Sequence, residues 1–450
     1  MGLVTFMGGL FAVICGGLAL GHSAVVGRVT LLDFALLAVG GMYGIGWVLV
    51  LHVTLAGDNP VWAPWIIPFE SLYLLHSIGA FLLLFGMLGG WYLMAHGWHV
   101  RSLPMMDGNG VGPQRWLAAF WLLLVGAVVA QGLYAHAYGG FLGQLEYSAA
   151  IRSALFDEVP HNPLSFLRPF GGLAMIAAFG FFGLRLSGYR TWSSCLGLVL
   201  SFAFSLYVLY SWLGRMGFMV FLATFPLGWG LNKSRSPVGL LLGSGVVFIG
   251  LVVGAYGVSV GLNLKSADSL LEFLARELAF PFGSFFAQLD CGEHLFRAGV
   301  DFLLTPLYLL PSSWWTSWFE PLGQTNTAVI MGASKGMAGV TGAIPVDLLT
   351  VGLMQFHMVG IALVGLLFGA LLRIVHGVLS RIPLPGVRAV FEASMALTLA
   401  VLGVFYAQPD LVVSGHIHWI AAALVCIGVF RLPRLGMARG GMVADRESAS

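Results

Sequence analysis

The sequence predicts an all-α protein that crosses a membrane many times as one helical bundle. Of its 450 residues, 58% are hydrophobic and only 9% are charged, and the mean hydropathy is +0.91. A soluble domain needs about a quarter of charged residues to cover its surface, so a soluble fold is excluded. The apolar residues also gather in runs of about 20, the length that an α-helix needs to cross the hydrocarbon core.

About eleven such runs are predicted to be transmembrane helices, and 1–450 is expected to form a single integral membrane domain. The first run lacks the basic residues of a signal peptide, so it is expected to remain as a span. The stretch 191–231 would reach roughly 60 Å as one helix, so it is expected to form a hairpin that turns near Ser211–Arg215. The predicted spans lie near 3–20, 31–56, 69–95, 116–138, 170–187, 191–210, 215–231, 237–260, 347–373, 388–406 and 411–430.

The basic residues predict the orientation of the bundle. Most of the 21 Lys and Arg residues fall in alternate loops, and cytoplasmic loops are the ones enriched in these residues. This end, which also holds the carboxyl terminus, is therefore expected to be cytoplasmic. The basic residues at this end are Arg28, Arg101, Arg115, Arg185, Arg190, Lys233, Arg235, Arg373, Arg381, Arg388, Arg431, Arg434, Arg439 and Arg446.

Two loops on the opposite, outer side are too long to be simple connections. They cover about 139–169 and 261–346, and most of the acidic residues lie on this side. The second loop begins with LKSADSLLEFLARELAF, whose leucines recur at helical spacing, so it predicts an amphipathic helix at the membrane surface. Further on, PSSWWTSWFEP places Trp314, Trp315 and Trp318 close together.

Two segments resemble those of Wzy-type O-antigen polymerases, which join oligosaccharide repeat units. GRMGFMVFLATFPLGWGLNKSR at 214–235 is similar to the small-Arg-small segment that opens a span in that family. TGAIPVDLLTVGLMQFHMVGIALVGLLFGALLR at 341–373 is similar to the segment that leaves its large outer loop, with Asp347 where relatives often carry a glutamate. The resemblance covers roughly 185–430; the amino-terminal half shares only the layout.

The resemblance implies a glycosyltransferase at the outer face of a bacterial inner membrane. It would transfer a growing glycan from a polyprenyl diphosphate to the sugar of another lipid-linked unit, and a chain-length regulator is a candidate partner. The leaving diphosphate needs fixed cations, and arginine binds phosphate through two parallel hydrogen bonds. The expected diphosphate ligands are Arg215, Arg276, Arg297, Arg152 and Arg168.

The same reaction needs a base for the attacking hydroxyl and flat apolar surfaces for the glycan. Candidate bases are Asp347, His294 and Glu277, and the three tryptophans are the candidate glycan platform. Several of these residues also have a structural interpretation. Arg215 could anchor the hairpin at the interface, Arg276 could pair with Glu272 four residues earlier, Asp347 could cap a helix, His294 could be surface, and the tryptophans could form an interfacial belt.

Two alternatives stay open. A ligase that moves the whole glycan to another acceptor shares every feature above. A flippase or transporter belongs to another class, but the charges gather at one face and no half-repeat is visible. The sequence predicts no metal site, no cofactor and no nucleic-acid partner, since the reaction requires none of them and the cysteines lie mostly in apolar runs.

Overall fold

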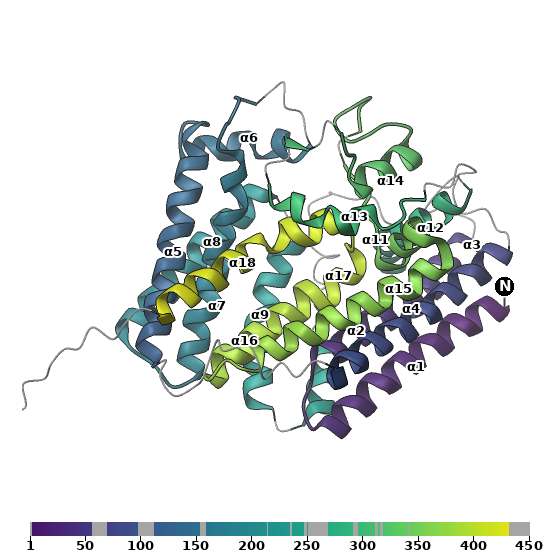
Figure 1. The fold of residues 1–450 in the computed structure, drawn as a ribbon, viewed down its shortest axis with the longest axis horizontal. Helices are drawn as coiled ribbons and strands as arrows, with labels where there is room; N and C mark the ends of the chain where they lie inside the picture. Colours follow the sequence, from purple (N-terminus) through teal and green to yellow (C-terminus); the bar gives the residue numbers. More distant parts are fainter. Residues whose placement is uncertain are drawn as a thin grey trace, which may run out of the picture.

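The computed structural model supports an all-α, multi-pass membrane architecture (Figure 1). The described part of the chain contains helices and turns but no β-strand. It comprises residues 2–55, 70–97, 112–153, 159–213, 215–234, 236–246, 250, 269–290, 296–310, 314–315, 318–340 and 342–431.

Nine helices within these residues are long and apolar enough to cross a membrane. Some contain a short π- or 3₁₀-helical segment, named η. In chain order the nine spans are formed by α1 (Gly2–Val26); α2 (Leu31–Gly40), η1 (Gly41–Gly46) and α3 (Trp47–Leu55); α4 (Glu70–Gly97); α5 (Pro113–His136); η4 (Ser165–Gly172) and α7 (Leu173–Leu186); α8 (Trp192–Trp212); α15 (Leu348–Leu379); α16 (Pro385–Met395), η7 (Ala396–Val401) and α17 (Leu402–Phe405); and α18 (Pro409–Arg431).

The two remaining predicted spans differ from these nine. The run 215–231 is helical within α9 (Arg215–Lys233), but it contains Arg215 and Pro226 and is not among the nine. Of 237–260, the structure describes a shorter apolar helix over Pro237–Val246. Between α8 and α9 the chain turns at Leu213, whose φ of 52° ends the preceding helix. A hairpin therefore joins α8 to α9.

Small residues let α4 and α15 pack backbone against backbone (Figure 1). A Cβ added at Gly90 would lie 1.9 Å from the carbonyl oxygen of Leu366, and one added at Gly369 would lie 2.0 Å from that of Met87. Lipid tails are as apolar as side chains, so helices in membranes associate through such close contacts. The contact between α4 and α15 is the most extensive between any two helices of the described chain.

The second outer loop folds into the bundle. Its predicted amphipathic helix is α11 (Leu270–Leu278), capped by the Ser269 hydroxyl. The following helices α12 (Phe280–Asp290) and α14 (Leu322–Met331) are largely buried. Three phenylalanines of α12 are at most 3% exposed and pack with Trp47, Tyr73 and His76, which belong to α3 and α4. The loop is thus part of the protein core, which its polar sequence did not indicate.

The span α15 is broken near its N-terminal end. Phe356 and His357 have non-helical backbone angles, and His357 has φ 51° and ψ −143°. A Cβ at Gly360 would lie 2.1 Å from the carbonyl oxygen of Gly352, so the two parts of α15 meet closely across the break. Two other spans contain the π-helical segments η1 and η7. Such interruptions leave backbone groups that need other partners.

Candidate functional site

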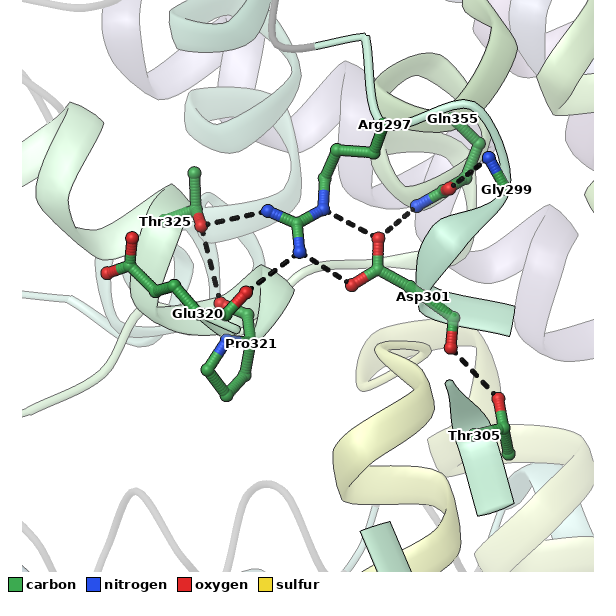
Figure 2. A network of polar contacts seen from close by, with 8 residues as sticks. All are labelled: Arg297, Gly299, Asp301, Thr305, Glu320, Pro321, Thr325 and Gln355. Atoms are coloured by element: carbon green, nitrogen blue, oxygen red, sulfur yellow. Dashed lines mark hydrogen bonds and ion pairs between the residues drawn. The ribbon is translucent and has the colours of Figure 1, made fainter. Parts of the chain in front are cut away.

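A buried ion pair holds the outer loop beside the break in α15 (Figure 2). The guanidinium of Arg297 donates through Nε to Oδ2 of Asp301 at 2.6 Å and through Nη2 to Oδ1 at 2.9 Å. The same group donates to the carbonyl oxygen of Glu320 at 2.8 Å and to the Thr325 hydroxyl at 3.2 Å. Four N–H bonds of Arg297 are therefore already used, and Asp301 is fully buried.

Gln355 connects this pair to α15. Its side-chain amide donates to Oδ2 of Asp301 at 2.7 Å and accepts a bond from the Gly299 amide at 3.0 Å. The amides of Arg297 and Ala298 donate to the carbonyl oxygens of Met354 and Gln355. These two carbonyls precede the break, so the loop supplies hydrogen bonds where helical partners are missing.

Asp347 lies at the start of α15 and is 1% exposed. Its Oδ2 accepts hydrogen bonds from the Leu349 amide at 3.1 Å and from the Tyr43 hydroxyl at 2.6 Å. Burial raises the pKa of Asp347 to about 6. Its other oxygen, Oδ1, is buried without a hydrogen-bond partner, and so is the Thr350 hydroxyl. Asp347 therefore caps the helix with one oxygen, while the other stays buried and free to take a proton.

A group of cations gathers near the end of α8, on the side of the bundle predicted to be outer. The group consists of Arg152 on α6 (Phe141–Ser153), Arg168 on η4, and Lys335 in the turn after α14. Burial, with Arg152 and Arg168 nearby, lowers the pKa of Lys335. Arg152 also donates to the carbonyl oxygen of Leu213 at 2.6 Å. We call Arg152, Arg168 and Lys335 the outer cation cluster.

This cluster lies beside the start of α9, because Leu213 ends α8 two residues before Arg215. Of Arg215 itself the structure describes the backbone position, at the first turn of α9. Two sequence-predicted diphosphate ligands, Arg152 and Arg168, are thus brought together. The salt bridges of the described residues include none of the three cluster members.

Other predicted site residues lie in different surroundings. Arg276 forms an ion pair with Glu272 on α11, the structural interpretation considered above, and Glu277 is exposed on the same helix. Trp315 is buried against Tyr308, with ring centroids 5.1 Å apart, whereas Trp314 and Trp318 are exposed. The prediction for His294 lies outside the described residues. The roles assigned to all these side chains stay predictions.

Sequence reasoning missed Lys335, Asp301 and Tyr43. Lys335 lies in a glycine-rich turn with no motif around it, and only the fold places it beside two arginines. Asp301 could have been noticed as an acid four residues after Arg297, since this spacing suits a helical ion pair. Tyr43 gave no signal within its apolar span.

The fold defines the class of protein as an all-α, multi-pass membrane protein with an outer loop packed into the bundle. No protein-family model, no curated protein and no solved structure matches the chain. Among the described residues, no group of three or more His, Cys, Asp or Glu side chains is arranged to hold a metal ion.

Proposed function

We propose that the protein is a glycosyltransferase that polymerises polyprenyl-diphosphate-linked oligosaccharides at the outer face of a bacterial inner membrane. One observation supports it most: Arg152, Arg168 and Lys335 lie together beside the start of α9, which carries Arg215. Cations held close together repel one another, and a nearby anion offsets this repulsion. A diphosphate leaving group at headgroup level would supply that anion and gain charge-assisted hydrogen bonds.

The proposed reaction assigns separate tasks to the protein. The outer cation cluster and Arg215 bind the diphosphate of the donor and stabilise its charge as the glycosidic bond to phosphate breaks. A carboxylate takes the proton of the attacking sugar hydroxyl, and Asp347 is the candidate with a raised pKa and an unpartnered oxygen. A ligase that uses the same donor would need the same groups, so it remains the alternative within this class.

A flippase or transporter for the same lipid-linked glycan is the second candidate function. The break in α15 and the π-helical segments η1 and η7 favour it, because transporters often bind substrates at interrupted helices. Tyr43 lies within η1 and donates a hydrogen bond to Asp347, which caps the start of the broken helix α15. The two functions differ in whether new glycosidic bonds form.

A reaction in detergent separates these functions, because micelles offer no second compartment. Purified protein would be incubated with a polyprenyl-diphosphate oligosaccharide, and the glycan lengths would be measured by mass spectrometry. Longer glycans support the polymerase. We expect Arg215→Ala to abolish them and Arg215→Lys to restore them only in part, while Arg190→Ala, at the opposite end, behaves as the wild type. If no product forms with any donor, while vesicles containing the protein move the lipid between leaflets, the transporter replaces our proposal.

A further inference from the structure

A second group of arginines lies at the end of the bundle opposite the outer cation cluster. Arg28 is in the turn between α1 and α2, Arg373 lies six residues before the end of α15, and Arg388 is in the first turns of α16. All three lie close enough to His376 to act on it electrostatically. We call Arg28, Arg373 and Arg388 the inner arginine cluster.

These arginines form no salt bridge among the described residues. None of their side chains forms a hydrogen bond or an ion pair there, although Arg373 lies over the ring of Trp91 at 5.2 Å. Glu392 is near Arg28 and Arg388, but its Oε1 is buried without a partner. Asp33 is also in this region, where its Oδ1 pairs with Nδ1 of His22 at 2.7 Å. Two carboxylates cannot balance three guanidinium groups. The cluster therefore keeps a net positive charge, which an anion would stabilise.

A buried histidine provides a second, independent indication. His376 is 2% exposed, and both of its ring nitrogens lack hydrogen-bond partners. Its ring lies 5.8 Å from that of Trp91, the same ring that Arg373 covers. An imidazole always carries at least one N–H donor, and buried donors are usually satisfied. His376 therefore adds a buried, unpartnered N–H donor beside the positive charge of the three arginines.

An apolar groove lies on the neighbouring part of α4. It has a volume of about 340 Å³ and is lined by Leu88, Gly89, Tyr92, Leu93 and His96. The ring of His22 links the two regions, since its centroid lies 6.2 Å from that of Trp91 and 6.4 Å from that of Tyr92. Positive charge at the end of spanning helices, next to an apolar groove, matches a phosphate headgroup with its acyl chain.

We propose that the inner arginine cluster binds the phosphate of an anionic phospholipid whose acyl chain lies in the groove on α4. The groove distinguishes this ligand from a free phosphate, which would use the arginines alone. A surface arginine that only anchors a helix needs no partner. Here three arginines from separate segments lie near one buried histidine. The proposal concerns the end of the protein opposite the outer cation cluster, so it does not depend on the glycosyltransferase proposal.

The test measures the thermal unfolding midpoint of delipidated protein in a neutral detergent. Phosphatidylglycerol, phosphatidylcholine and inorganic phosphate would be titrated separately at constant ionic strength. We expect only phosphatidylglycerol to raise the midpoint. Arg28→Gln should require about tenfold more of this lipid for half of the effect, as the loss of a charge-assisted hydrogen bond implies. Arg190→Gln changes another exposed arginine at the same end. This variant should need the same amount of phosphatidylglycerol as the wild type.

Further variants separate the headgroup from the chain. Gly89→Leu fills the groove and should weaken the effect of phosphatidylglycerol. Arg373→Gln should weaken it as well. If that variant does not fold, the lipid titration of Arg28→Gln, at an exposed position, still tests the proposal. Equal stabilisation by phosphatidylcholine, or an unchanged titration of Arg28→Gln, would overturn the proposal. An equal effect of inorganic phosphate would also overturn it, because the site would then bind a free anion.

Discussion

The hydroxyl of Tyr43 donates a 2.6 Å hydrogen bond to Oδ2 of Asp347, across 304 residues of sequence. Tyr43 belongs to the π-helical segment η1, and Asp347 precedes the first turn of α15. The bond therefore joins an interruption in the second span to the start of a broken one. It also leaves Oδ1 of Asp347 buried and unpartnered.

We expect Asp347 to make the protein less stable as the pH rises. Burial raises its pKa from 3.8 to about 6, so the folded state holds the proton more tightly than the unfolded state. Its contribution to stability is present below about pH 4 and is lost as the pH rises through about 6. Thermal unfolding in detergent between pH 5 and pH 8 measures this effect.

Asp347→Asn provides the control for this pH dependence. Asparagine is also a good helix cap, so the variant should fold while losing the titrating group. We expect the midpoint of Asp347→Asn to change less between pH 5 and pH 8 than that of the wild type. Equal pH dependence in both proteins would show that Asp347 does not titrate in this range.

Removing Asp301 should destabilise the protein strongly. Asp301→Ala leaves the guanidinium of Arg297 in a largely buried place without its carboxylate, which costs about 3–5 kcal/mol in similar pairs. Glu272→Gln breaks the matched i, i+4 pair with Arg276, which is more exposed, and should cost at most about 1 kcal/mol. Chemical denaturation would give both free energies. Similar costs for the two variants would contradict a special role for the Arg297–Asp301 pair.

The contact between α4 and α15 predicts opposite effects for two adjacent glycines. Gly90→Ala places a methyl group 1.9 Å from the carbonyl oxygen of Leu366, so the helices must separate, at a cost of about 1–3 kcal/mol or more. Gly89→Ala meets nothing within 4 Å and should be neutral or stabilising by up to about 1 kcal/mol, as in a helix interior. Unfolding midpoints of the two variants test this difference directly.

Lys335 should matter for glycan polymerisation if the proposed function is right. Lys335→Ala removes one cation of the outer cation cluster, and we expect kcat/KM for the lipid-linked donor to fall at least about tenfold, as the loss of a charge-assisted hydrogen bond implies. Lys233→Ala, an exposed lysine at the other end of α9, should leave the rate unchanged. Equal rates for both variants would remove Lys335 from the diphosphate site.

The sequence indicated the spans because membrane insertion depends on local hydropathy. Nine of the predicted apolar runs correspond to helices long enough to cross, and the turn between α8 and α9 falls at Leu213. The predicted amphipathic stretch contains α11. Arg276 pairs with Glu272 there, which was the structural interpretation of Arg276. These features depend on residues close together in the chain, so their spacing carries the information.

Hydropathy and spacing alone therefore determined that this protein is an all-α membrane bundle with two long segments between its spans. Only the tertiary structure decided that α12 and α14 pack inside it, that α15 breaks at Phe356 and His357, and that Lys335 joins Arg152 and Arg168. Each of these depends on contacts between residues far apart in sequence. Such contacts follow from side-chain packing and from the need to pair buried polar groups, and neither leaves a periodic pattern in the chain.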